Sequence, residues 1–200
     1  MFDHFAKEKS DFLRKKDKSR KGRIDKGIIK IISTLNSKND YYTTSSCAGR
    51  IVLLEIKSRK KDECRWIFIK HDEVTFNEIN NSLKKYNNNI KNNKTNKKIE
   101  NQIWLKQQPV ILHVACRNLD AARKLLDASR KIFKHSGMIG VTDKKATIEI
   151  IGNERIETVI ADNNFAADEK YFKNLIKYAN KNFVENKSKI GKFFSLIKGL

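Results

Sequence analysis

Short apolar runs of strand length, joined by both hairpin-length and helix-length segments, constrain the fold of this chain most. Residues 50–56 and 65–70 are rich in aliphatic and β-branched side chains, and the charged link 57–63 is long enough for a hairpin loop. Residues 109–116, which begin at the only proline, have the pattern of a buried strand. Further strands are predicted at 138–142, 146–151 and 155–161.

Helical spacing of apolar residues predicts the remaining elements. Amphipathic helices are expected over 2–13, 23–36 and 75–86, and a helix of about four turns should follow Asn118, a suitable N-cap. A C-terminal helix from 167 to 185 precedes a short basic amphipathic end. Strands joined by hairpins and by helices favour an α+β fold, with a mixed, largely antiparallel sheet and flanking helices.

One tract is polar and repetitive. Residues 87–101 consist mostly of asparagine and lysine, with little to bury, so they are predicted to form a low-complexity loop. The length of 200 residues suits one domain over 1–200 that includes this loop and the C-terminal helix.

The charge balance favours a polyanionic partner. Lysine and arginine number 43 against 23 acids, a formal net charge of +20. Such a field concentrates RNA or an anionic surface, although solubility alone is an alternative explanation. Within the basic segment 14–23, phosphate contacts are predicted for a set of five residues. They are Lys16, Lys18, Ser19, Arg20 and Lys21.

The cellular setting is predicted from features that are absent. No apolar run approaches the roughly 20 residues that span a bilayer, and the N-terminus lacks the layout of a signal peptide. The three cysteines are scattered, which does not indicate a disulfide framework. A reduced cytoplasmic protein without a membrane partner is expected, and no obligate protein partner is evident.

The densest unusual stretch runs from Tyr41 to Arg50, between a helix end and a strand start. It is interpreted as a turn whose hydroxyls and backbone could bind a carboxylate or phosphate, with Arg50 as a bidentate clamp and Gly49 allowing close approach. The alternative is a polar turn that caps its own backbone groups. Cys47 could be a nucleophile, but a lone cysteine more often packs.

Three histidines stand at or near the ends of predicted elements: His71, His113 and His135. Any of them could orient a substrate or accept a proton, and each alone is more often structural. His113 and Cys116 are three residues apart on a predicted strand, so their side chains should leave opposite faces. That spacing does not make a metal site, and none is predicted.

Glycine usage excludes a common nucleotide-binding turn. The chain has eight glycines and no G-x-G-x-x-G after a strand, so the usual turn of Rossmann-type methyltransferases is not visible. Pattern alone therefore names no cofactor.

Taken together, three motifs resemble one family. They are residues 16–22, the stretch 41–50, and 112–116 with the helix that follows to Gly137. Their order and spacing resemble the tRNA wybutosine-synthesising protein 3 family, whose hallmark is S-x-S-S-C-x-G-R. Thr43 replaces the leading serine and keeps the hydroxyl. The other hallmark positions match, namely Ser45, Ser46, Cys47, Gly49 and Arg50.

The resemblance covers nearly the whole chain and implies a function. It implies an S-adenosylmethionine-dependent methyltransferase that modifies N-4 of 7-aminocarboxypropyl-4-demethylwyosine, next to the anticodon of phenylalanine tRNA. It also implies a fold other than the Rossmann methyltransferase fold. The tract 87–101 departs from the family, which puts RNA contacts there in doubt.

The resemblance also suggests site roles. His113 or His71 is the best candidate for a base or orienting group, and Cys47 is expected to line the pocket. The cofactor, or the carboxylate of the modified base, is expected on Ser45, Ser46, Gly49 and Arg50. Two alternatives share the charge: a non-catalytic tRNA-binding module, and an RNA-modifying enzyme in which Cys47 attacks a base.

Overall fold

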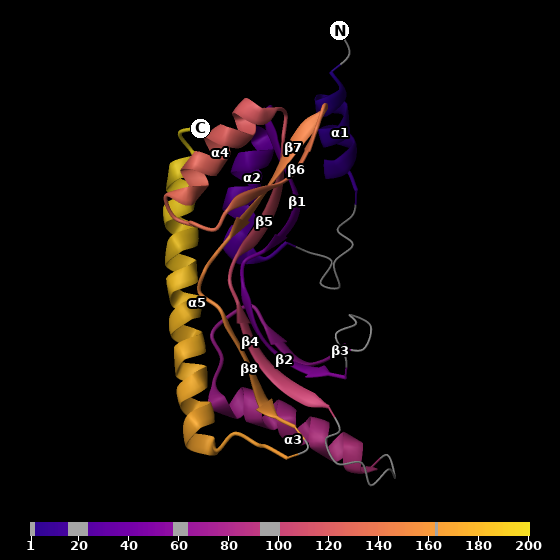
Figure 1. Cartoon of the computed structure of the whole chain (residues 1–200), viewed down its shortest axis with the longest axis vertical. Helices are drawn as coiled ribbons and strands as arrows, with labels where there is room; N and C mark the ends of the chain where they lie inside the picture. Colours follow the sequence, from indigo (N-terminus) through magenta and orange to yellow (C-terminus); the bar gives the residue numbers. More distant parts are fainter. Residues whose placement is uncertain (1–2, 16–23, 58–63, 93–100, 163) are drawn as a thin grey trace. The chain divides into compact units, whose positions relative to one another are not determined.

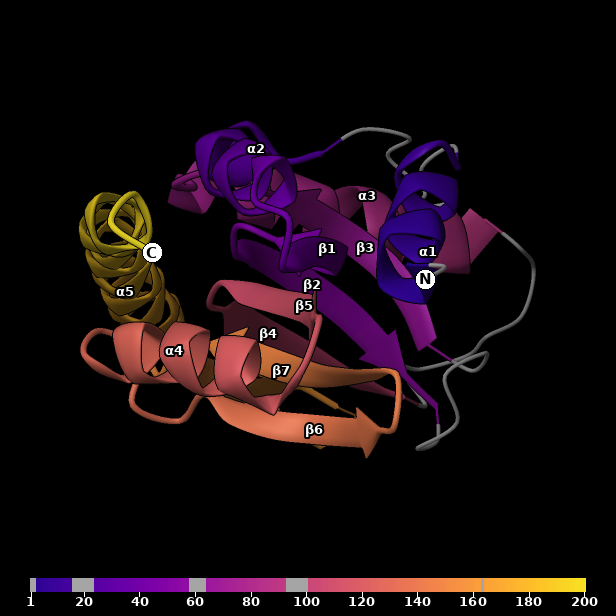
Figure 2. The same ribbon diagram turned by 90° about the horizontal axis from the view of Figure 1, so that it is seen from above.

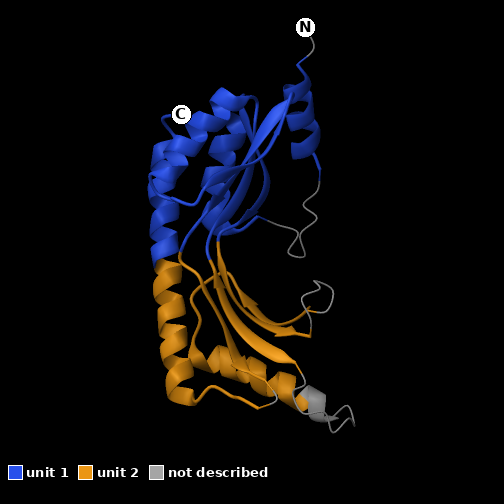
Figure 3. Ribbon diagram, viewed as in Figure 1, with its two compact units in different colours: residues 1–48, 109–153, 185–200 blue, residues 49–108, 154–184 orange. Residues whose placement is uncertain are grey.

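The computed structural model describes residues 3–15, 24–57, 64–92, 101–162 and 164–200, and the side chains of 89–92 are not included. The described chain divides into two compact units, coloured separately in Figure 3. Unit 1 contains residues 1–48, 109–153 and 185–200, and unit 2 contains residues 49–108 and 154–184. Each unit is therefore built from segments that are distant in sequence. The single domain expected over 1–200 stays a prediction.

Unit 1 contains a four-stranded antiparallel sheet in the order β1-β5-β7-β6. Its strands are β1 (Tyr41–Cys47), β5 (Ile111–Cys116), β6 (Gly137–Thr142) and β7 (Lys145–Ile151). Its helices are α1 (His4–Leu13), the 3-10 turn η1 (Lys26–Ile28), α2 (Ile29–Ser37), α4 (Leu119–Arg130) and the last part of α5 (Glu169–Ile197). Figure 2 shows α4 lying across β7 and β6.

The two faces of this sheet carry different residues, because side chains alternate along a strand. One face packs on α2, α4 and the end of α5, with Leu112, Val114 and Ile148 fully buried in the main core of the unit. The other face bears a smaller cluster in which α1 covers Tyr42 and Ala115. In Figure 1, α1 accordingly lies on one side of the strands and α2 and α4 on the other.

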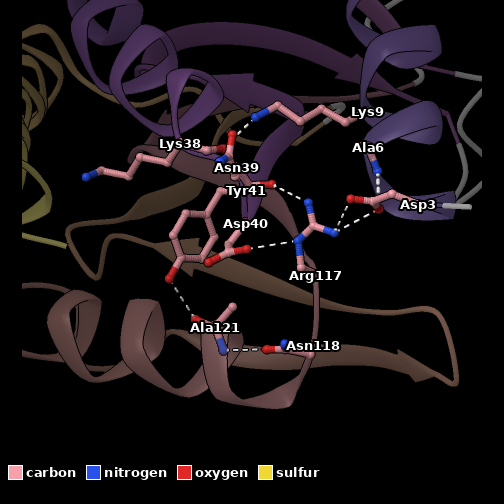
Figure 4. A network of polar contacts seen from close by, with 10 residues as sticks. All are labelled: Asp3, Ala6, Lys9, Lys38, Asn39, Asp40, Tyr41, Arg117, Asn118 and Ala121. Atoms are coloured by element: carbon pink, nitrogen blue, oxygen red, sulfur yellow. Dashed lines mark hydrogen bonds and ion pairs between the residues drawn. The ribbon is translucent and has the colours of Figure 1, made fainter. Parts of the chain in front are cut away.

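An ionic network at Arg117 attaches the start of α1 to the body of unit 1 (Figure 4). The guanidinium donates through Nη1 to both carboxylate oxygens of Asp3 at 2.8 Å and through Nε to Asp40 at 2.9 Å. Asp3 is also the N-cap of α1, accepting from the backbone N–H of Ala6 at 2.9 Å. One carboxylate therefore caps the helix and binds the cation.

Unit 2 contains the second antiparallel sheet, in the order β3-β2-β4-β8. Its strands are β2 (Arg50–Ile56), β3 (Cys64–Lys70), β4 (Gln102–Gln108) and β8 (Ile156–Ala161), and its helices are α3 (Phe76–Asn92) and the first part of α5. Ile51, Leu53 and Leu105 point from one face of the sheet into a core shared with both helices. No described helix is long and apolar enough to cross a membrane.

The α+β fold class is confirmed, and most elements match their predicted positions. The strands predicted at 50–56, 65–70, 138–142, 146–151 and 155–161 are all present, as is the helix capped by Asn118, whose side chain accepts from Ala121 N–H at 2.9 Å. The mixed sheet is realised as two purely antiparallel sheets.

Four details of the prediction are wrong. Residues 41–47 form strand β1 rather than a turn, because Tyr41 and Tyr42 are buried on opposite faces of the sheet. Residues 87–92 continue α3, whose buried face already includes Ile79 and Tyr86, so the loop is wrong there, and 93–100 lie outside the described residues. Strand β4 was not foreseen, and α5 is one helix from 169 to 197.

Candidate active site

Strand β1 presents its hydroxyl-rich half after an irregularity in the sheet. The register with β5 shifts between Thr43 and Ser45, which places Ser45 directly opposite His113. The preceding residues are structural. Tyr41 donates from its buried hydroxyl to the carbonyl of Ala121 at 3.0 Å, and Tyr42 packs between Phe5 and Phe12 with ring centroids 5.4 Å away in each case. Neither tyrosine is therefore open to a nucleic acid base.

Three side chains form a hydrogen-bonded row across β1, β5 and β7. Ser45 Oγ lies 2.9 Å from His113 Nδ1, and His113 Nε2 lies 2.9 Å from Glu149 Oε2. An ionised carboxylate can only accept, so the ring carries a proton on Nε2 directed at Glu149. In the neutral ring Nδ1 is then the acceptor, and the Ser45 hydroxyl donates to it. The row thus presents an oriented basic nitrogen.

This row is accessible. The His113 and Glu149 side chains are each 30% exposed, and Ser45 is exposed at the start of the row. A substrate proton could therefore reach Nδ1 in place of the Ser45 hydroxyl. A row of this geometry can act chemically as a general base with an orienting carboxylate.

Buried polar groups fix the end of β1. The carboxylate of Asp25 accepts from the backbone N–H of Ala48 at 3.0 Å, while Asn186 Nδ2 donates to the Ala48 carbonyl at 2.8 Å. Asn186 Oδ1 also accepts from Val110 N–H at 2.8 Å. Asn186 is fully buried, so it satisfies backbone groups of two chain segments at once.

The backbone is equally constrained beside Asn186. A Cβ on Gly152 would lie 2.7 Å from Cβ of Pro109 and 3.3 Å from Oδ1 of Asn186, so only glycine fits there without a shift. Gly49 has a positive φ of 101°, which glycine adopts without strain, and the close approach of a ligand there stays a prediction.

Arg50 begins β2 in unit 2. Its Nε donates to Gln108 Oε1 at 2.6 Å, and its Cζ lies 4.7 Å from the centroid of the Trp66 ring. Among the described residues, its hydrogen bonding uses Nε alone, which leaves the two Nη amino groups able to grip a carboxylate or phosphate.

The remaining predicted site residues belong to several different elements. Cys47 ends β1 and is half-buried, while Ser46 precedes it on the same strand. His71 follows β3 in unit 2 and is half-buried, whereas His135 is exposed after α4. Cys116 is fully buried in the main core, and burial raises the pKa of its thiol to about 12. It points away from the face that bears His113, as its spacing predicted.

The predicted phosphate contacts at Lys16, Lys18, Ser19, Arg20 and Lys21 lie outside the described residues. Three residues that hold parts of the site in place were not predicted from the sequence: Glu149, Asp25 and Asn186. Glu149 is a charged residue in an otherwise apolar strand pattern, which was the available indication. Asp25 and Asn186 stand next to charged residues, and the partners of all three are remote in sequence.

The chain matches a known protein family along almost its whole length. Residues 7–199 match the family described as Methyltransferase TYW3. The chain is 30% identical over 184 residues to the tRNA(Phe) 7-((3-amino-3-carboxypropyl)-4-demethylwyosine(37)-N(4))-methyltransferase 1 of Pyrococcus abyssi, covering 90% of this chain and 89% of that protein. It is 33% identical over 165 residues to the corresponding methyltransferase of Methanocaldococcus jannaschii, covering 80% and 79%.

The fold is also known. The PH1069 protein of Pyrococcus horikoshii OT3 superposes with a TM-score of 0.80 at 27% identity, covering 99% of this chain and 95% of that one. The fold and the matches define a methyltransferase that is not built on the Rossmann fold. The chain belongs to the TYW3 methyltransferase family, so the resemblance drawn from the motifs is confirmed.

Proposed function

We propose that this chain methylates ring nitrogen N-4 of 7-aminocarboxypropyl-4-demethylwyosine, next to the anticodon of phenylalanine tRNA, with S-adenosylmethionine as methyl donor. The proposal is supported by family membership and by the substrate in the names of the relatives. The structural observation that carries it is the Ser45–His113–Glu149 row, which holds a basic nitrogen on an accessible sheet face. The proposed location is the cytoplasm, in keeping with three cysteine thiols.

The chemistry requires alignment more than activation. When bound, the donor supplies a methyl group that is already electrophilic, so the protein must place the acceptor nitrogen in line with it. His113 Nδ1 would accept the N-4 proton, and Glu149 would hold the ring and stabilise its positive charge. A base of this kind typically contributes about 10²- to 10⁴-fold in rate.

The residues of the hallmark motif suit an anionic ligand group. The Nη groups of Arg50 can bind a carboxylate in bidentate fashion, and both the donor and the substrate side chain carry one. Ser46 and Gly49 are proposed to contribute a hydroxyl and a close backbone approach at the same ligand. Ser45 was assigned to this group as well, and its contact with His113 adds a proposed role in positioning the His113 ring. His71 stays an alternative base.

Cys47 is proposed to line the pocket without forming an adduct. The Cys47→Ser variant should therefore keep measurable methyl transfer, whereas a mechanism with Cys47 as nucleophile requires complete loss.

Calorimetric titration with S-adenosylmethionine, and with S-adenosylhomocysteine as second ligand, tests the donor. One-site binding that weakens in Arg50→Ala supports the proposal. The absence of heat at protein concentrations that would reveal a dissociation constant of ~100 μM, about −5.5 kcal/mol, would favour a tRNA-binding module, provided that added tRNA restores no binding.

A further inference from the structure

Both tryptophans of the chain lie on one face of the unit 2 sheet. Leu54 of β2 stands opposite Trp66 of β3 and opposite Trp104 of β4, so the three side chains form one row across the strands. Val52, two residues before Leu54, stands opposite Lys106 on the same face. We call Arg50, Trp66, Trp104 and Lys106 the tryptophan face.

This face is opposite the one that the helices of unit 2 cover. Ile51, Leu53, Ile103 and Leu105 alternate with it and enter the core formed with α3 and α5. No residue of the tryptophan face belongs to that core within the described residues. Trp66 and Trp104 are half-buried, so part of each ring is accessible.

A cation lies over each tryptophan ring. Arg50 Cζ lies 4.7 Å from the Trp66 ring centroid, and Lys106 Nζ lies 5.1 Å from that of Trp104. Lys106 also pairs with Glu157 at 3.2 Å, which keeps the ammonium near the ring. The sheet therefore carries two cation–π pairs, Arg50 with Trp66 and Lys106 with Trp104.

We propose that the tryptophan face stacks unpaired nucleotides of the RNA substrate, with Trp66 and Trp104 against bases and Lys106 near a phosphate. A four-stranded antiparallel sheet with helices on one face and aromatic rings on the other is a recurring platform for single-stranded RNA. The net charge of +20 complements a polyanion. Tyr41 and Tyr42 are not available for stacking, because both are buried in unit 1.

The inference rests on the proposed function for the identity of the RNA, but its test is separate. The probe is an unmodified anticodon stem-loop of phenylalanine tRNA, compared with duplex RNA of equal length. Trp66→Leu and Trp104→Leu keep apolar cover over Leu54 and remove the ring. Each should raise the dissociation constant for the stem-loop about 5- to 140-fold, because one stack is worth about 1–3 kcal/mol.

Matched variants separate stacking from charge. Trp66→Phe and Trp104→Phe should stay within a few-fold of the native affinity, and Tyr178→Leu on exposed α5 should change nothing. Lys106→Gln should lower the dependence of log affinity on log salt concentration by about one unit or less, whereas the leucine variants should leave that slope unchanged.

A second measurement uses the native chain, in case a leucine variant fails to fold. Saturating stem-loop should quench the intrinsic tryptophan fluorescence, and duplex RNA should not. Native affinity in both leucine variants, or unchanged native fluorescence at saturation, would overturn the proposal. Equal affinity for duplex and stem-loop RNA would also overturn it. If methyl transfer survives these results, the proposed function stands. If stacking is intact and methyl transfer is absent, only the proposed function is removed.

Discussion

At the scale of single residues, Glu149 is the group on which the orientation of His113 depends. Its carboxylate holds the ring by a 2.9 Å contact with Nε2. Glu149→Gln should therefore lower kcat for methyl transfer about 10- to 100-fold with little change in KM for either substrate, the size typical of losing an orienting partner. Glu149→Asp should recover part of the rate. Glu169→Gln, at an exposed position, serves as the control. A higher KM with an unchanged kcat in Glu149→Gln would contradict the assignment.

The cysteines should differ in reactivity in the folded protein. Cys116 is fully buried, and burial raises the pKa of its thiol to about 12, so little thiolate forms near neutrality. Alkylation at about pH 8 should leave Cys116 unmodified in native protein and modify it after unfolding. Peptide mass mapping reads the result. Rapid native labelling of Cys116 would show that the main core of unit 1 opens readily.

The sequence predicted some site residues and not others for a physical reason. Ser45 and His113 stood in recognisable motifs, and the strand pattern around His113 was clear. Their pairing, however, depends on the register between β1 and β5, separated by more than sixty residues. Asn186 could not be found from its neighbours, since its partners Ala48 and Val110 are brought to it by the fold.

At the scale of elements, the attachment of α1 depends on pH. The pKa of Asp3 is lowered by the Ala6 N–H and by Arg117, and that of Glu8 is lowered by its hydrogen bond to Lys145. A lowered acid pKa stabilises the fold above the unfolded values, 3.8 and 4.5, and this contribution disappears as pH falls through the lower folded values. The raised pKa of Lys145 adds stability that is lost only above about 10.5.

Amide hydrogen exchange can test this. Protection of α1, relative to α4, should be highest between about pH 5 and 10 and should fall about two- to fivefold as the carboxylates protonate, as expected for exposed ion pairs. Lys145→Met should remove part of the dependence on pH. Constant relative protection from pH 3 to 7 would show that α1 is held by Phe5 and Phe12 alone.

Asn186 makes the second prediction at this scale. Asn186→Leu leaves the Val110 N–H and the Ala48 carbonyl without their partner, which costs about 1–3 kcal/mol for each buried group. Urea denaturation should show this loss, while exposed Asn174→Ala in the same helix should change stability by less than about 0.5 kcal/mol. Equal stability of the two variants would mean that water replaces the lost contacts.

The errors in predicting elements share a cause. The hydroxyl-rich stretch 41–47 has the composition of a turn, yet two buried tyrosines and pairing with β5 make it a strand. The first asparagines after Tyr86 have low helix propensity, and α3 still extends through them. In both places tertiary packing overrides local preference.

At the scale of the whole molecule, the fold class was predictable and the division into units was not. Alternating runs of strand and helix length indicated α+β, and they were correct in most positions. The chain passes from one unit to the other at 48/49, 108/109, 153/154 and 184/185. Which segments make up each unit therefore depends on long-range strand pairings. The family was predicted from motifs. The periodicity of apolar residues predicts helices and strands, and it carries no information about a methyl donor.

The most direct test of the proposed function is the mass of the RNA product. Purified protein is incubated with S-adenosylmethionine and phenylalanine tRNA that carries the demethylwyosine precursor, and the digested nucleosides are resolved by mass spectrometry. The proposed function predicts that the modified nucleoside gains the mass of one methyl group, with fragmentation that places it on the ring and not on the side chain. An unchanged nucleoside, in a preparation that binds both substrates, would contradict it.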